Sequence, residues 1–186
     1  MSAQLDWTEL LAQQLRWHWE AHLRPRLNGL TDDEYIWEPV RGCWNLRARS
    51  QSTAPVQAGA GELVIEFELP EPDPPPVTTI AWRLAHLIVP VLGERNASHF
   101  GGPPVEFSTA TWAGTADGAL KQLDAAYTIW IDAVGALTTD ALTMRVGPAE
   151  GPFADDPMAG LVLHIHREVI HHGSEITLLR DLYRNR

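Results

Sequence analysis

Apolar residues recur every three or four positions in four separate stretches of the chain, which is the spacing of helices that bury one face. These stretches cover residues 4–29, about 79–98, about 115–137 and about 157–184. Long connections separate them. The pattern predicts an all-α fold, and a four-helix bundle is the most economical arrangement that buries all four apolar faces.

Short polar residues mark where several of these helices are expected to begin. Thr31 and Glu34 have the spacing of a capping box, so a short helical turn should follow the first helix. Asp156 precedes Pro157, a residue that suits the first position of a helix. The expected N-caps of the other main helices are Thr78 or Thr79, Thr115 and Asp156.

Residues 38–78 have no helical period and differ from the rest of the chain. The run "ELVIEFEL" alternates apolar and polar residues, and "PEPDPPP" forms a stiff connector after it. We expect two short strands or extended segments, near 43–49 and 62–69. They form a small excursion between the first and second main helices, so residues 1–186 are expected to make one domain.

The composition excludes several classes of partner. The chain has 186 residues and a formal net charge of −10, with no basic stripe, which argues against binding to nucleic acid or to an anionic membrane surface. No window approaches the roughly 18 uninterrupted apolar residues of a membrane span, and no signal peptide is recognisable. Cys43 is the only cysteine, which suits a reducing compartment. We expect a cytoplasmic protein that acts on a small-molecule substrate.

The chain contains eight tryptophans. Four lie within expected helices and are predicted to be buried: Trp7, Trp19, Trp82 and Trp130. Three lie in expected loops, where they either pin the loops to the bundle or line the mouth of a pocket: Trp37, Trp44 and Trp112.

Candidate chemistry is concentrated in the last helix, in the sequence "HREVIHHGSE". One stripe of this helix is aliphatic apart from Glu168 and His172, which are four residues apart. Four residues turn a helix by about 400°, so the two side chains lie roughly 40° apart and one turn along the axis. A single metal ion could bind both of them. A buried hydrogen bond between the two would also satisfy them, so both interpretations remain open.

A third ligand is available in the second helix, where His86 lies in an apolar context. Pro90 follows four residues later and cannot donate to the carbonyl of His86, so the helix is expected to kink or widen there. A lone histidine in such a place is more often a core residue. It gains interest because the last helix offers a matching pair.

The remaining histidines are weaker candidates. His18 and His22 are also four residues apart and form a rival pair, and His164 precedes Glu168 by one turn as a substitute or supporting ligand. We expect no metal role for the remaining three, of which the first two should lie at the surface and the last in a loop: His166, His171 and His99.

Several stretches resemble the DinB-like superfamily, whose members are four-helix-bundle metal proteins. The resemblance rests on "HWEAHLRPRLNGLTDDEYIWEPV", "PPPVTTIAWRLAHL" and "REVIHHGSEITLLRDLYR". It spans most of the chain, although residues 45–70 and 103–155 carry little of it. The branch that the chain resembles contains uncharacterised actinobacterial proteins.

The resemblance implies a metal site with one histidine on the second helix and an H-x3-H pair on the last. These positions are His86, Glu168 and His172 in this sequence, so the first histidine of the pair is replaced by glutamate. The mycothiol-dependent maleylpyruvate isomerases, which the chain also resembles, use this His, Glu and His combination. Two imidazoles and one carboxylate suit zinc best, and nickel, iron or manganese also fit.

The same resemblance implies a divalent-metal-dependent enzyme that performs S-transfer or isomerisation with a low-molecular-weight thiol such as mycothiol. Arg83 or Arg167 would then bind an acidic group of the substrate, or either is simply a solvated arginine. A homodimer formed through helix faces is compatible with this architecture.

Two other functions remain open. A metal-dependent hydrolase would use a bound water, with Glu175, about one turn after His172, as general base or as a carboxylate that supports a ligand. A non-catalytic protein would use the polar cluster to bind a ligand or a partner.

Overall fold

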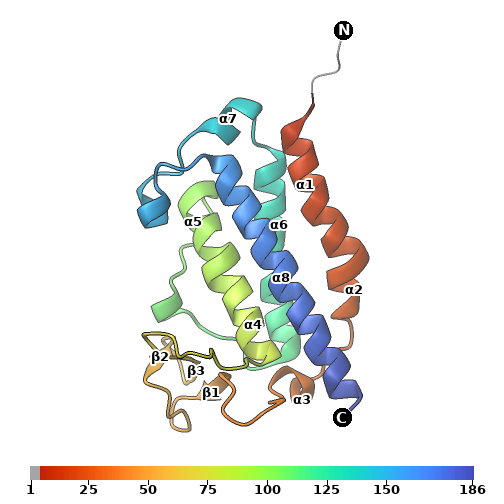
Figure 1. The fold of residues 1–186 in the computed structure, drawn as a ribbon, viewed down its shortest axis with the longest axis vertical. Coiled ribbons are helices and arrows are strands. Elements are labelled where there is room, and N and C mark those ends of the chain that lie inside the picture. Colours follow the sequence, from red (N-terminus) through yellow and green to blue (C-terminus); the bar gives the residue numbers. More distant parts are fainter. Residues whose placement is uncertain (1–4) are drawn as a thin grey trace.

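The computed structural model describes residues 5–186, which form a mostly helical protein with one small sheet (Figure 1). Four long helical segments lie alongside one another. Their bounds are Trp7–Arg26 (α1, Trp7–His18; η1, Trp19–Leu23; α2, Arg24–Arg26), Ile80–Phe100 (α4, Ile80–His86; η2, Leu87–Gly93; α5, Glu94–Phe100), Ala116–Gly135 (α6) and Met158–Arg184 (α8). Short helices occupy Asp32–Tyr35 (α3) and Thr139–Thr143 (α7), and 3₁₀ turns occupy Phe107–Thr109 (η3) and Pro148–Phe153 (η4).

The long helices pack around one apolar core. The last helix, α8, contacts α1 and α4, and α6 contacts α1, α4 and α5. Fully buried side chains from all four segments meet there, among them Leu15, Leu84, Trp130 and Ile165. Burial of this apolar surface is the main force that holds the helices together. No helix within the described part of the chain is long and apolar enough to cross a membrane.

Three of the expected N-caps are confirmed. Each threonine accepts a hydrogen bond at its Oγ1 from a backbone N–H three residues later: Thr31 from Glu34 (3.2 Å), Thr79 from Trp82 (3.3 Å) and Thr115 from Gly118 (3.2 Å). Each bond satisfies one of the N–H groups that a helix start leaves without a partner.

The expected cap of the last helix is wrong. The helix begins at Met158, and Pro157 occupies the N-cap position in an extended conformation with no side-chain cap, so Asp156 lies outside the helix. The cause is tertiary. Pro157 forms a bridge with Arg145, and the N–H of Met158 donates to the carbonyl of Met144 at 2.8 Å, which keeps the chain extended up to this point.

The excursion between the first and second long segments is a three-stranded antiparallel sheet. The strands are Leu46–Ala48 (β1), Val56–Ala58 (β2) and Leu63–Phe67 (β3), in the order β1-β3-β2. Strands β1 and β3 lie within the two expected segments, whereas β2 was not expected. The indole of Trp82 on α4 donates to the carbonyl of Glu66 on β3 at 2.8 Å. This bond attaches the sheet to the start of α4.

The second long segment widens immediately after His86. Residues Leu87–Gly93 (η2) are π-helical, and the N–H of Glu94 donates to the carbonyl of Val89, five residues earlier. Pro90 has no N–H to give to the carbonyl of His86, so an ordinary α-helical turn cannot close there. The expected kink or widening at this proline is therefore confirmed.

A buried ion pair joins α3 to the end of α8. Arg180 Nε lies 2.6 Å from Glu34 Oε1, and Nη2 lies 3.1 Å from Oε2, in a bidentate arrangement. Both side chains are almost fully buried. Arg180 Nη1 also donates to the carbonyls of Arg26 and Asn28. The pair replaces the water that both charged groups would otherwise bind.

The tryptophans follow the sequence-based expectation with one exception. Trp19, Trp82 and Trp130 are buried, but Trp7 is 54% exposed because it lies on the outer face of the first turn of α1. In the loops, Trp44 and Trp112 are buried, and the indole of Trp112 donates to the carbonyl of Ala58 at 2.8 Å. These two residues attach their loops to the rest of the protein.

Candidate metal centre

Three side chains from two helices meet near the middle of the molecule. His86 lies at the end of α4, and Glu168 and His172 lie one turn apart on α8. Their ligand atoms all lie within 4.8 Å of one another. The imidazole rings of His86 and His172 have centroids 4.8 Å apart and planes almost perpendicular. The three residues that were predicted from the sequence as ligands are therefore neighbours in space.

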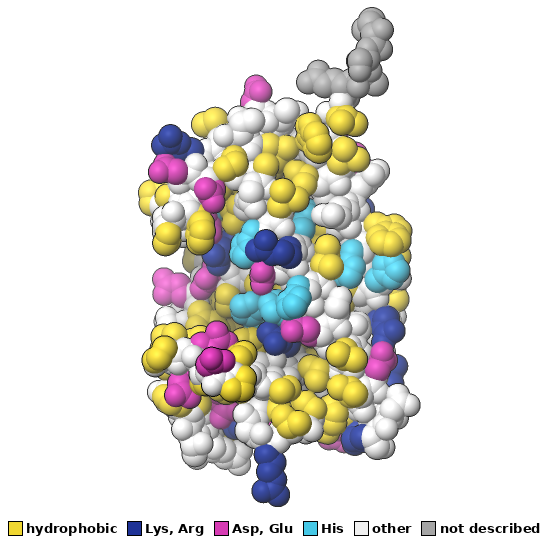
Figure 2. All heavy atoms as spheres, viewed as in Figure 1, with side chains coloured by type: hydrophobic (Ala, Val, Ile, Leu, Met, Phe, Trp, Pro, Cys, Tyr) yellow, Lys and Arg dark blue, Asp and Glu magenta, His cyan; other side chains and the backbone are white. Residues whose placement is uncertain are grey.

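The stripe of α8 that carries Glu168 and His172 packs toward the interior, and its aliphatic members Leu161, Ile165 and Ile176 are buried. His172 is buried as well, while Glu168 is partly exposed. Figure 2 shows histidine, carboxylate and arginine side chains gathered across the middle of this face, with hydrophobic side chains above and below them. The cluster thus lies at the surface end of a buried seam.

His86 is held as a neutral imidazole. Burial, together with the nearby His172 and Arg83, lowers its pKa to about 3. Its ring stacks on Trp82, with centroids 5.5 Å apart and planes at 10°. A neutral imidazole keeps a lone pair, which is the form that binds a metal ion.

His172 lies between two carboxylates. Its Nδ1 is 2.6 Å from Glu175 Oε2, and its Nε2 is 3.1 Å from Glu168 Oε2. A neutral imidazole carries one N–H and can donate to only one of them. The second nitrogen then faces a carboxylate oxygen with lone pair against lone pair. With Nδ1–H donated to Glu175, a second proton or a cation shared by Nε2 and Glu168 removes this conflict. In the other tautomer, Nε2–H donates to Glu168 and Nδ1 accepts from Arg83 Nη1 at 3.3 Å.

Glu175 is an ionised hydrogen-bond acceptor. Burial raises its pKa, but the hydrogen bond from His172 and the positive charge of Arg83 outweigh that effect, so the net shift is downward. Arg83 Nε lies 3.0 Å from its Oε2. A carboxylate with a lowered pKa is a poor proton acceptor near neutral pH. This environment favours a supporting role, in which Glu175 orients the ring of His172, over that of general base.

The two arginines considered from the sequence have different environments. Arg83 is 20% exposed and is engaged by Glu175 and by the face of Trp82. Arg167 is 70% exposed, and its Nη2 donates to His164 Nδ1 at 2.6 Å. Of the two guanidinium groups, that of Arg167 is the more accessible to an acidic ligand.

The other histidine candidates lie outside the cluster. His164 Nδ1 approaches Glu168 Oε1 at 3.7 Å but does not belong to the three-residue group. His18 and His22 stack with their centroids 6.1 Å apart. Within residues 5–186, no third ligating side chain comes close enough to this pair to form a metal-binding group.

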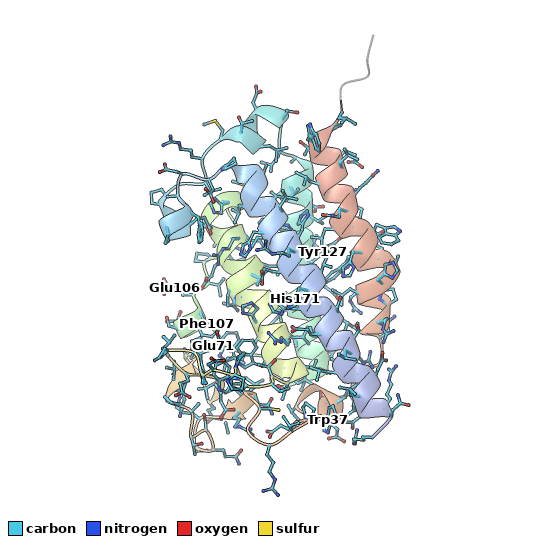
Figure 3. All side chains as sticks on the ribbon, viewed as in Figure 1. Trp37, Glu71, Glu106, Phe107, Tyr127 and His171 are labelled. Carbon is cyan, nitrogen blue, oxygen red and sulfur yellow. The ribbon has the colours of Figure 1, made fainter. Side chains whose placement is uncertain are left out.

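The expectation that His166 lies on the surface is wrong. Its side chain is 1% exposed, its ring lies near Trp130, and neither ring nitrogen has a hydrogen-bond partner within the described residues. Burial lowers its pKa to about 4. The reason is that α8 buries a second face, which packs toward α1 and α6. His171, in contrast, is 63% exposed, as expected (Figure 3).

His99 lies in a helix rather than a loop, because α5 continues to Phe100. Its Nε2 is 2.8 Å from Glu150 Oε1, and Arg95 Nη2 is 3.2 Å from Oε2 of the same carboxylate. Both His99 and Glu150 are buried. This group holds the η4 segment against α5.

A pocket of about 430 Å³ lies beside the cluster, and no sequence pattern predicts it. Phe153 and Glu150 from η4, Arg95 from α5, and His164 and Arg167 from α8 are among the residues that line it. His164 and Arg167 also contact Glu168, at 3.7 and 3.8 Å. The pocket therefore adjoins the candidate metal centre along α8.

Comparison with known protein families gives a match. A family model described as the DinB superfamily matches residues 14–176, which is most of the chain and includes all three candidate ligands. No curated protein and no solved structure gives a significant match.

Proposed function

The chain belongs to the DinB superfamily, and on this premise we propose that it is an enzyme that binds one divalent metal ion through His86, Glu168 and His172. Proteins of this superfamily bind divalent metals. We also propose that its four long helical segments form a four-helix bundle of the kind typical of the family. The reaction that we propose is S-transfer or isomerisation with a low-molecular-weight thiol such as mycothiol.

The observation that carries the proposal is the position of His172 between two carboxylates. With Nδ1–H donated to Glu175, the free Nε2 lone pair and Glu168 face each other, and the neutral ring of His86 completes the group. This donor set suits a divalent ion and leaves positions open for a further ligand. Zinc is the first choice, and nickel, iron or manganese would also fit.

Each neighbouring residue has a defined part in this proposal. A bound divalent ion would lower the pKa of a thiol or a water molecule that coordinates it. Glu175 fixes the ring of His172 through Nδ1, and Trp82 fixes the ring of His86 by stacking. The adjoining pocket would hold a small-molecule substrate, and Arg167 would bind an acidic group on it.

The thiol reaction is tested by calorimetric titration of the zinc-loaded protein with mycothiol. The Glu168→Ala variant is the control. Saturable binding by the wild type that is absent in the variant is the expected result. Zinc-loaded protein that binds no thiol would exclude this reaction. Hydrolysis of a simple ester without any thiol would then favour the hydrolase, and neither activity would favour a non-catalytic role.

Glu175→Gln tests whether this residue orients His172. The neutral amide oxygen accepts the Nδ1–H more weakly than a carboxylate does, so zinc affinity should fall by about 10–100-fold, the usual cost of weakening a partner that supports a ligand. Competition with a chromophoric chelator measures the affinity. His171→Gln is the control, because this exposed side chain contacts Glu175 only at 3.4 Å. Equal affinity in Glu175→Gln and the wild type would contradict the assigned role.

A further inference from the structure

A second group of ligand atoms overlaps the first. His171, His172 and Glu175 also bring their ligand atoms within 4.8 Å of one another. His172 belongs to both groups, with Nε2 directed toward Glu168 and Nδ1 toward Glu175. The exposed ring of His171, labelled on α8 in Figure 3, supplies the third member. By donor type alone, this second group is as suitable for a divalent ion as the first.

Arg83 already places a positive charge in the second group. Its Nε is 3.0 Å from Glu175 Oε2, and its Nη1 is 3.3 Å from His172 Nδ1. A guanidinium does not lose its proton in proteins, so this charge is permanent. The side chain is mostly buried and its cation lies 5.3 Å from the ring centre of Trp82, which restricts its movement.

The position of Arg83 in the chain links it to the first group. It precedes His86 by three residues on α4, so the helix that delivers one candidate ligand also delivers this cation. A divalent ion bound to Glu175 and His171 would lie next to the guanidinium and be repelled by it. At the same time the guanidinium holds the Glu175 carboxylate in place against Nδ1 of His172.

We propose that Arg83 keeps the centre mononuclear: it takes the place of a second divalent ion at His171, His172 and Glu175, and thereby reserves His172 Nε2 for the ion shared with His86 and Glu168. This inference rests on the proposed metal site. Arg83 acts through Glu175 and His172, so it is a positioning residue.

The experiment is a zinc titration of the full chain, with the number of ions per chain as the readout. The wild type should bind one ion, and Arg83→Ala should bind two. Without the guanidinium, His171 and Glu175 become free to bind the second ion. Nδ1 of His172 can join them as a ligand after it releases its proton to solvent. The double variant Arg83→Ala, His171→Ala should return to one. Arg83→Lys keeps a cation in place and should also bind one. Circular dichroism checks the fold, and Arg83→Gln replaces the alanine variant if that variant does not fold.

Arg167→Ala is the control, because this exposed arginine lies 3.8 Å from Glu168 but does not contact Glu175 or His172. One ion in Arg83→Ala, with wild-type affinity, would overturn the inference. If the wild type binds none while Arg83→Ala binds one that His171→Ala removes, Arg83 does exclude an ion from the second group, but the proposed metal site and the mononuclear centre that rests on it both fail. No ion in either protein overturns both.

Discussion

His86→Ala should abolish stoichiometric metal binding. His86 is the only member of the proposed ligand set that comes from α4, and without it Glu168 and His172 remain as two ligands on one helix. We expect zinc affinity to fall by more than about 100-fold, beyond the cost of losing a partner that only supports a ligand. Elemental analysis of the purified protein after reconstitution and desalting measures the loss.

His164→Ala is the matched control for this experiment. His164 lies one turn from Glu168, on the same side of α8, but outside the three-residue group. The His164→Ala protein should retain the wild-type metal content. A His86→Ala protein that still holds its zinc would show that the ion binds elsewhere. Glu168 and His172 would then be interpreted as a structural hydrogen-bonded pair.

Glu34→Ala should cause the largest loss of stability among the substitutions considered. The change leaves the guanidinium of Arg180 buried with two backbone carbonyls as its only partners. Breaking a buried pair by removing one partner costs about 3–5 kcal/mol of the free energy of unfolding. Urea denaturation followed by circular dichroism measures the change.

The control for the buried pair is Asp181→Ala. Arg26 Nη2 and Asp181 Oδ1 are 2.6 Å apart, a distance equal to that of the buried pair, but both side chains are about half exposed. Exposed pairs contribute at most about 1 kcal/mol. If the two variants lost equal stability, burial of the Arg180 pair would not be the source of its contribution.

The helices could be predicted because their signals are local. Apolar spacing marked the four long segments, and Thr31, Thr79 and Thr115 cap helices through residues only three positions away. Strand β2 escaped prediction because its residues, Val56–Ala58, lie among small residues and carry a weak strand signal of their own. Its pairing with β3 is what makes it a strand. The start of α8 was misplaced because a distant segment, at Arg145, decides where the extended chain ends.

In the candidate site, too, the local features could be predicted from the sequence and the long-range contacts could not. That Glu168 and His172 share a face followed from their spacing, whereas the choice of His86 needed its apolar context and the family resemblance. The contact between Arg83 and Glu175 joins residues 92 positions apart on two helices, and no local pattern indicates it. His166 was misplaced because a single apolar stripe was assumed for α8, although this helix buries two faces.

The widened turns of η2 have a consequence for how this protein tolerates insertions and deletions. A hydrogen-bonded ring there encloses one residue more than in an α-helix, so the chain between His86 and Arg95 is longer than a regular helix of that rise would need. Deleting Pro90 would let an α-helical turn close there, and Arg95 and His99 would keep nearly the same direction relative to His86, because the wide turn already absorbs the extra residue. Both side chains would then stay within reach of Glu150. The widened segment is therefore the place where this helix can lose a residue without separating the ligand from the pocket wall.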